Sequence, residues 1–189
     1  MRTEGFEALL ATLKKAAVAL HQDGVPFLLG GGVACWVRGG PESDHDLDLM
    51  VKEEDADQAL EALERRGFRT EKPPEGWLYK AWDDGVLVDL IFHPTGMPIT
   101  DEVIERGEEL EVEALPMRVM TLEDVFVTKL LALDERSLDY APALEMARPV
   151  REQVDWADVR RRTAESPFAK AFFTLIEELG IVTPRPAGT

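Results

Sequence analysis

Two aspartates at alternate positions are the residues best suited by type and spacing to carry chemistry. Asp46 and Asp48 lie in Asp46-Leu47-Asp48-Leu49-Met50-Val51, where polar and apolar residues alternate in a way that predicts a strand. Side chains two residues apart on a strand project from the same face, so we expect the carboxylates to point together and the leucines to enter the core. Convergent carboxylates repel each other unless a cation lies between them, and Mg²⁺ is the usual cation beside phosphates.

A third aspartate stands alone within an apolar segment. Asp89 lies in the middle of Leu87-Val88-Asp89-Leu90-Ile91-Phe92, where burying a carboxylate is costly unless it is paired, hydrogen-bonded or bound to metal. If this strand is adjacent to the one with Asp46 and Asp48, the three carboxylates can hold two Mg²⁺ ions. One ion would activate an attacking hydroxyl, and the other would neutralise a leaving pyrophosphate.

Three consecutive glycines follow the short apolar segment 27–29 and precede the apolar segment 33–38, which we expect to be a short buried helix. Glycines at a helix start let backbone amides approach an anion closely, and the positive end of the helix favours phosphate. Gly30-Gly31-Gly32 therefore indicates a phosphate-binding turn. The alternative is a tight strand-to-helix turn with no ligand.

The glycine pair and the three aspartates together resemble the nucleotidyltransferase superfamily typified by DNA polymerase β. The matching residues are Gly31-Gly32, thirteen intervening residues, Asp46-Leu47-Asp48, and Asp89 within its apolar strand. The chain is most similar to small bacterial members, which include antibiotic nucleotidyltransferases and toxins of AbiE-type abortive-infection systems. Residues 121–130 also resemble those proteins, and the similarity extends over roughly residues 25–135.

The resemblance implies a nucleoside triphosphate (NTP) donor, two Mg²⁺ ions and a set of site residues. Asp44 departs from the family pattern, which commonly has threonine two places before the first paired aspartate, and Ser43 is the residue expected to substitute. The implied metal ligands and catalytic residues are Asp46, Asp48 and Asp89, the last also helping to deprotonate the acceptor hydroxyl; the implied nucleotide-binding residues are Gly31, Gly32, Ser43 and Lys129.

The elements that must position these residues predict an α+β fold: a mixed β-sheet nucleotidyltransferase core with flanking helices and a C-terminal helical unit. We expect a core over 1–120, a helical unit over 121–182 and a flexible tail over 183–189. Thr121 and Asp155 are expected to cap helices. The predicted strands are 27–29, 46–51, 77–82 and 86–92 around Asp83-Asp84-Gly85, and an extended 112–120 interrupted at Pro116; the predicted helices are 5–21, 33–38, 53–66, 125–133, 141–146, 156–162 and 168–179.

Charge and composition narrow the function classes. The chain has 21 Lys and Arg against 37 Asp and Glu, a net charge of −16, so broad binding to nucleic acid is disfavoured. With 45% hydrophobic residues the composition is that of a folded globular protein. The single cysteine, Cys35, excludes an internal disulfide and a cysteine-rich zinc site. We find no membrane span or secretory signal, and expect a cytoplasmic protein.

We therefore predict a Mg²⁺-dependent nucleotidyltransferase that moves a nucleoside monophosphate to a hydroxyl acceptor and releases pyrophosphate. The acceptor can be a cationic antibiotic-like small molecule, a protein, or an RNA end held by a local cradle of Arg148, Arg151 and Arg160–Arg162. A toxin role would add a protein antitoxin as a partner. The alternative is a catalytically inactive nucleotide-binding or protein-interaction module of the same fold.

Each candidate residue also has a plainer interpretation. Asp46 and Asp48 can be ordinary solvent-facing residues or, less readily, part of a calcium loop, and Asp89 can be tied to a basic neighbour. Lys129 can be an exposed helix lysine, and the arginine cluster can be a solvated helix face. His45 is expected to pack or lie on the surface, and Cys35 to be a small buried side chain. Trp77 and Trp82 can flank a pocket.

Overall fold

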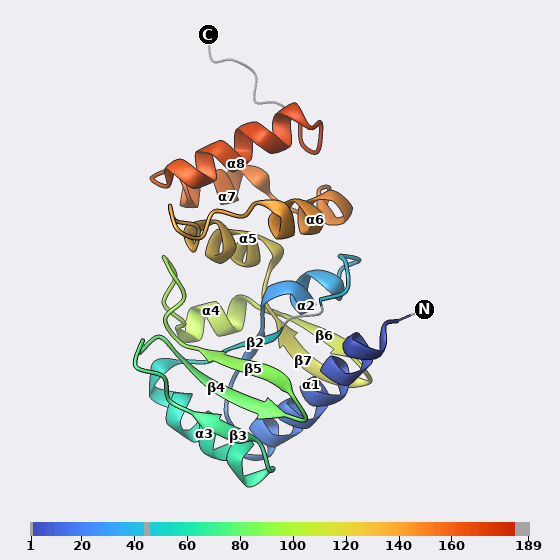
Figure 1. The fold of residues 1–189 in the computed structure, drawn as a ribbon, viewed down its shortest axis with the longest axis vertical. Coiled ribbons are helices and arrows are strands. Elements are labelled where there is room, and N and C mark those ends of the chain that lie inside the picture. Colours follow the sequence, from blue (N-terminus) through green and yellow to red (C-terminus); the bar gives the residue numbers. More distant parts are fainter. Residues whose placement is uncertain (1, 44–45, 184–189) are drawn as a thin grey trace.

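A seven-stranded mixed sheet forms one half of the molecule, in a computed structural model that describes residues 2–43 and 46–183 (Figure 1). The strand order is β3-β4-β5-β2-β1-β7-β6. The predicted α+β fold with a mixed sheet is confirmed. The strands are β1 Leu28–Leu29, β2 Asp46–Met50, β3 Arg69–Glu71, β4 Leu78–Asp83, β5 Val86–Ile91, β6 Glu108–Val112 and β7 Leu115–Val119.

Helices cover the sheet and continue beyond it. Helices α1 and α3 pack against β2, β4 and β5. Helix α5 packs against α2, which lies beside the sheet, and against α6, α7 and α8 in the other half of the molecule. No helix in the described part of the chain is long and apolar enough to cross a membrane. The helices are α1 Glu4–Gln22, α2 Gly31–Trp36, α3 Ala56–Arg65 after a 3-10 turn at Glu53–Asp55, α4 Asp101–Arg106, α5 Leu122–Leu131, α6 Ala141–Val150, α7 Trp156–Arg162 and α8 Pro167–Glu178.

Strands β2 and β5 are parallel neighbours, although three elements separate them in the chain. Leu47 pairs with Val88, and Asp48 lies directly opposite Asp89. Because side chains alternate along each strand, Leu47 and Val88 share one face with 0% exposure, and the aspartates share the other. Covering the apolar face with α1 and α3 leaves the acidic face free for a site.

The two predicted caps stabilise helices beyond the sheet. The Thr121 hydroxyl accepts a hydrogen bond from the backbone N–H of Asp124, and the Asp155 carboxylate accepts from Ala157 and Asp158. Both side chains satisfy amides that lack partners in the first turn of a helix. The helices pack through aromatic side chains, with the rings of Phe126 and Trp156 centred 4.8 Å apart.

One predicted element was wrong. The stretch 112–120 is not a single extended segment interrupted at Pro116: β6 and β7 form a hairpin that turns at Glu113 and Ala114, both with positive φ. Pro116 lies inside β7 opposite Glu111, and the strand continues because β1 pairs with β7 only near Val119. A proline, which has no N–H, is tolerated at a strand position where no neighbouring strand needs a hydrogen bond from that residue.

Three short elements, β3, α4 and nearly all of β6, were not predicted. The start of α4 does carry a sequence signal, because the Thr100 hydroxyl accepts from the backbone N–H of Val103 and Asp101 and Glu102 occupy the first turn. Helix α2 begins at Gly31, two residues before its predicted start. The predicted tail begins at Thr183, and its remaining residues lie outside the described part of the chain.

Candidate active site

The two carboxylates of β2 and the carboxylate of β5 converge on the free face of the sheet. Asp46, Asp48 and Asp89 each offer one carboxylate oxygen, and these oxygens all lie within 4.8 Å of one another. Asp46 and Asp48 are half-buried, and Asp89 is 8% exposed. Such a separation suits oxygen ligands around a divalent cation.

The glycine turn lies directly against this cluster. Gly31 begins α2 with φ of +56°, a left-handed conformation that L side chains rarely adopt. A Cβ at Gly31 would also come within 1.8 Å of Asp48 Oδ2. The backbone N–H of Gly30 donates to the Asp48 carbonyl over 2.8 Å, which ties the turn to β2. Only glycine allows this approach of the turn to the carboxylate.

Ser43 lies against the second residue of the glycine pair. A Cβ at Gly32 would meet Ser43 Oγ at 2.8 Å, so the hydroxyl lies beside the backbone at the start of α2. The structure therefore brings Ser43 and Gly32 together, next to Gly31 and Asp48. Asp44 and His45, which follow Ser43, lie outside the described residues.

Asp89 has a basic neighbour that does not satisfy it. Lys80 lies opposite Asp89 on β4, with Nζ 3.7 Å from Oδ1, which is too long for a hydrogen bond. Oδ1 is buried and has no hydrogen-bond partner. Burial raises the pKa of Asp89, and Lys80 partly offsets this effect. The alternative prediction was that Asp89 is tied to a basic neighbour. The structure provides such a neighbour in Lys80, but the contact is a loose ion pair without a hydrogen bond.

Crowding of the carboxylates changes how Asp48 ionises. Burial, followed by repulsion from Asp46 and Asp89, raises the pKa of Asp48 to about 7, and Lys129 acts in the opposite direction. The cluster is therefore short of positive charge at neutral pH. An orphaned buried oxygen, three converging carboxylates and a glycine that leaves them room fit a divalent metal ion.

A cavity of about 550 Å³ opens beside Asp48. Gly31, Asp48 and Lys129 line it, so α5 brings Lys129 to the same space as the turn and the carboxylate. Trp77 also lines the cavity, whereas Trp82 lies under the Arg69 guanidinium, 3.7 Å from its ring centre. Of the two tryptophans expected to flank a pocket, the structure places Trp77 there.

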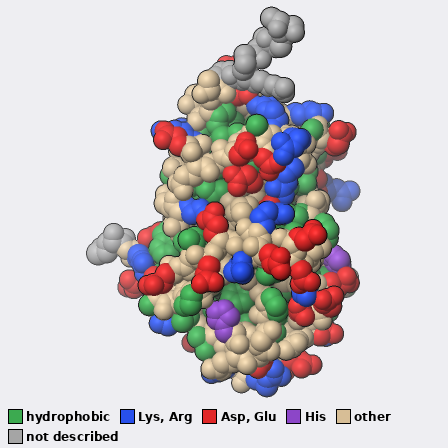
Figure 2. All heavy atoms as spheres, turned by 180° about the vertical axis from the view of Figure 1, so that it is seen from behind, with side chains coloured by type: hydrophobic (Ala, Val, Ile, Leu, Met, Phe, Trp, Pro, Cys, Tyr) green, Lys and Arg blue, Asp and Glu red, His purple; other side chains and the backbone are tan. Residues whose placement is uncertain are grey.

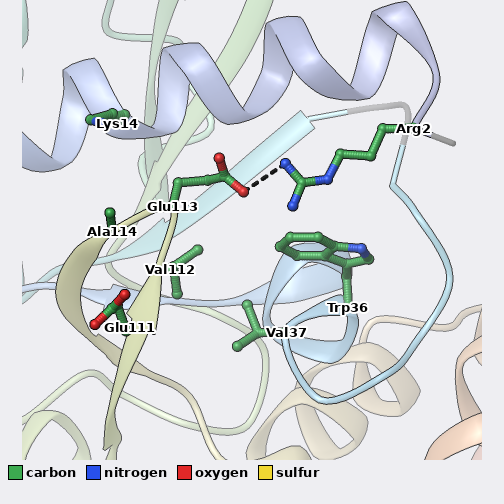
Figure 3. A pocket seen from close by; sticks show the side chains of 8 residues that line it. All are labelled: Arg2, Lys14, Trp36, Val37, Glu111, Val112, Glu113 and Ala114. Atoms are coloured by element: carbon green, nitrogen blue, oxygen red, sulfur yellow. Dashed lines mark ion pairs between the residues drawn. The ribbon is translucent and has the colours of Figure 1, made fainter.

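A second hollow, of about 590 Å³, lies away from the predicted residues (Figure 3). Two of its ionic groups are paired: Arg2 and Glu113 form an ion pair of 2.7 Å, and the Arg2 guanidinium lies 5.2 Å from the centre of the Trp36 ring. None of the converging aspartates lines it. The chemistry is therefore better placed at the carboxylate cluster.

The arginine cluster of α7 is paired within the protein. Arg160 pairs with Glu177, Arg161 with Asp158, and Arg162 with Asp158 and with the buried Asp124. On the face shown in Figure 2, positive side chains are scattered among acidic ones. Because these arginines already have carboxylate partners, the structure favours the interpretation of a helix face over an RNA cradle.

Sequence reasoning missed Lys80, although a signal was present. Asp84 and Gly85 both have positive φ, as a two-residue hairpin turn requires. Such a turn places Asp83 opposite Val86 and, three pairs along, Lys80 opposite Asp89. Treating Asp83-Asp84-Gly85 as a three-residue turn hides this register.

Comparison with known families gives the class of protein to which the chain belongs. A family described as nucleotidyl transferases of unknown function (DUF2204) matches residues 9–167, most of the chain. The protein is thus of the nucleotidyltransferase class, as its sequence resemblance implied. Within that class, the chain belongs to the DUF2204 family. A comparison with curated protein sequences found no match.

Solved structures share the fold at low sequence identity. The antibiotic-resistance factor ANT(2'')-Ia in solution is similar over 92% of this chain and 98% of its own, with a TM-score of 0.63 and 17% identity. A crystal structure of ANT(2'')-Ia in complex with adenylyl-2''-tobramycin is similar over 86% and 98%, with a TM-score of 0.61 and 16% identity. A candidate nucleotidyltransferase from Thermotoga maritima is similar over 76% and 91%, with a TM-score of 0.51 and 18% identity.

Proposed function

We propose that this protein transfers a nucleoside monophosphate from an NTP to a hydroxyl acceptor and releases pyrophosphate in a Mg²⁺-dependent reaction. One observation carries the proposal: the carboxylates of Asp46, Asp48 and Asp89 converge within 4.8 Å beside a turn that only Gly31 can form. Membership of a nucleotidyl transferase family supports the same reaction class.

The donor triphosphate would bind between the glycine turn and α5. The backbone at Gly31 and Gly32 allows close approach of phosphate oxygens, with Ser43 beside it. Lys129 lines the same cavity as Gly31 and supplies a positive charge for phosphate. These residues would orient the α-phosphorus toward the carboxylate cluster.

Asp46, Asp48 and Asp89 would hold Mg²⁺. When bound, the metal supplies positive charge that offsets the carboxylates and stabilises the charge that develops on the leaving pyrophosphate. Two ions match the three-carboxylate set that the sequence resemblance implies. Occupation of the cluster would also remove the proton that the raised pKa of Asp48 otherwise retains.

Asp89 would accept the proton of the acceptor hydroxyl. The acceptor oxygen forms a bond to the α-phosphorus, the bond from that phosphorus to the bridging oxygen breaks, and the electron pair leaves with pyrophosphate. The raised pKa of Asp89 makes its carboxylate a better proton acceptor than an ordinary aspartate. Lys80, 3.7 Å away, opposes the rise in the pKa of Asp89 and so favours the ionised carboxylate.

The acceptor to test first is a cationic small molecule with several hydroxyls. A net charge of −16 attracts such a compound and repels RNA ends. The structural neighbour ANT(2'')-Ia, solved with adenylyl-2''-tobramycin, supports including aminoglycosides. Protein hydroxyls form a second acceptor class, and a toxin acting on such a target would be recognised by its requirement for an antitoxin partner.

The direct test is transfer of α-labelled nucleotide from each NTP to panels of aminoglycosides, proteins and RNA ends. We expect labelled product and pyrophosphate only with Mg²⁺. Replacing Asp46 or Asp48 by Asn should slow transfer by at least about a hundredfold, because each removes charge needed for metal binding. Asp84→Asn is the matched control, since Asn tolerates the positive φ at this hairpin tip.

Two outcomes would contradict the proposal. Transfer at the parental rate by both the Asp46 and the Asp48 variant would remove the carboxylates from the reaction. Calorimetry that shows Mg²⁺-dependent NTP binding, with no pyrophosphate released across the panels, would favour the inactive nucleotide-binding module instead.

A further inference from the structure

An exposed aromatic side chain lines the cavity beside Asp48. Three large hydrophobic residues are exposed in the described part of the chain: Trp77 at 42%, Leu138 at 50% and Leu179 at 46%. Trp77 lines the cavity, and Leu138 lies between Ser137 and Asp139, which also line it. An exposed apolar residue on an open surface needs no explanation, but a large aromatic side chain that lines a cavity offers a face that a ligand can cover.

The lining of this cavity changes character from one end to the other. Gly31, Asp48 and Lys129 provide the polar end that belongs to the proposed phosphate site. The remaining wall is largely apolar. It is drawn from the ends of β2 and β5, the loop after β5, the residue before β4, α5, and the segment from the end of α5 to the start of α6. The apolar lining residues include Met50, Trp77, Ile91, Pro94, Val125 and Leu133.

A ligand that matches both ends has an anionic end and a flat apolar end. Asp48 and Asp139 are the carboxylates of the described residues that line the cavity, and Asp48 belongs to the metal cluster. A polycationic acceptor would therefore find little negative charge on the remaining wall. Of the two reactants of the proposed transfer, the NTP has the matching form.

The backbone holds Trp77 in place while its ring stays exposed. The carbonyl of Trp77 accepts hydrogen bonds from the backbone N–H groups of Phe92 and His93, both over 3.1 Å. These bonds secure the start of β4 to the end of β5, which carries Asp89. The indole is thus presented from a rigid position near the carboxylates, and aromatic faces stack readily on nucleobases.

We infer that this cavity binds the nucleoside part of the donor NTP, with the indole of Trp77 as the stacking face for the base. This inference rests on the proposed function and adds the residue that holds the base. It also assigns the cavity to the donor, so the acceptor approaches the carboxylate cluster from another side.

The test compares binding of NTP with binding of inorganic tripolyphosphate, which lacks a base, in the presence of Mg²⁺. Trp77→Ala should weaken NTP binding about tenfold and leave tripolyphosphate binding unchanged, because it removes only a stacking face. Trp77→Phe should restore most of the NTP affinity. Leu179→Ala, which removes an exposed apolar side chain remote from the cavity, is the matched control.

Tryptophan fluorescence gives a second readout. NTP should quench the emission of the parent protein, and Trp77→Phe should lose this quenching while still binding NTP. Equal NTP affinity of the parent and Trp77→Ala proteins would overturn the inference. So would a loss in Trp77→Ala confined to the KM for the acceptor. Failure of the parent to bind either NTP or tripolyphosphate would instead contradict the proposed function.

Discussion

Asp89 and Asp124 are both buried aspartates, 8% and 1% exposed, yet their surroundings are opposite. Arg106 donates to Asp124 Oδ2 from Nε over 3.0 Å and from Nη2 over 2.8 Å, and Arg162 donates to Oδ1 over 2.6 Å. Asp89 has only Lys80 at 3.7 Å, and its Oδ1 has no hydrogen-bond partner. Every oxygen of one carboxylate is satisfied, and the other is left incomplete.

We infer from this difference that Asp124 is a structural carboxylate and that Asp89 is available to a ligand. Asp124 on α5 ties α4 on the sheet side to α7 among the C-terminal helices, so its ion pairs hold two parts of the molecule together. A buried charge without full compensation costs stability and is retained where a ligand supplies what is missing. Asp89 fits this second description because Asp46 and Asp48 lie beside it.

The largest expected effect is a difference in stability between variants of these two aspartates. Asp124→Asn should destabilise the fold by about 3 kcal/mol, because it leaves two arginines without their carboxylate. This corresponds to a fall in Tm of roughly 6–12 °C for a chain of this size. Asp89→Asn should leave Tm unchanged or raise it, and should abolish nucleotidyl transfer.

Thermal unfolding and transfer assays on both variants check this comparison. A fall in Tm of similar size for Asp89→Asn would show that the ion pair with Lys80 is structural. Full transfer activity in that variant would remove Asp89 from the reaction.

A smaller effect is expected at the glycine turn. Gly31→Ala should cost about 1–3 kcal/mol from backbone strain and should also weaken Mg²⁺ binding, because its Cβ would displace the Asp48 carboxylate. Gly24→Ala is the control: φ there is +68°, but a Cβ would meet nothing within 4 Å. The two variants share the strain and differ in the clash. Equal Mg²⁺ affinity, measured by calorimetry, would mean that the turn does not support the metal site.

A further expected effect is a pH dependence of the free energy of unfolding. The pKa of Asp48 rises from 3.8 to about 7 on folding, so the folded protein holds this proton more tightly than the unfolded chain does. Its contribution to stability is therefore present at low pH and is lost as pH rises through the window from about 4 to about 7. Asp48→Asn should remove this loss and unfold at a higher temperature than the parent at about pH 8 without metal.

Metal should reverse the same trend. Because Mg²⁺ must displace the proton of Asp48, the rise in Tm caused by Mg²⁺ should be larger at about pH 8 than at about pH 5.5. Differential scanning fluorimetry with Mg²⁺ and with chelator measures both halves of the prediction. An equal rise in Tm at the two pH values would show that Mg²⁺ does not displace a proton from Asp48.

The local parts of the site were predictable from the sequence. Alternation along residues 46–51 predicted that Asp46 and Asp48 share a face, and the structure places their carboxylates together. The glycine run predicted a turn into a helix, and Asp84-Gly85 lies in the predicted hairpin. Each of these features depends on residues within a few positions of one another, where strand period and turn conformation are decided.

The partners of these residues were not predictable in the same way. That Asp89 lies opposite Asp48 depends on β5 pairing with β2. That Arg162 pairs with Asp124 depends on how α7 packs on α5. The prediction that Pro116 interrupts a strand was wrong. Strand β7 pairs with β1 only near Val119, so no hydrogen bond from an N–H at position 116 is needed on that side. Each of these contacts joins residues that the sequence keeps far apart.

What the residue order determined by itself is a set of chemical groups on short elements: two carboxylates on one strand face, a lone acid in another strand, and a turn without side chains. What only the tertiary structure decided is their meeting, the loose contact of Lys80 with Asp89, and the cavity that Trp77 and Lys129 share. The reason is physical. Strand and turn preferences act over a few residues, whereas strand order and helix packing follow from burying one common core.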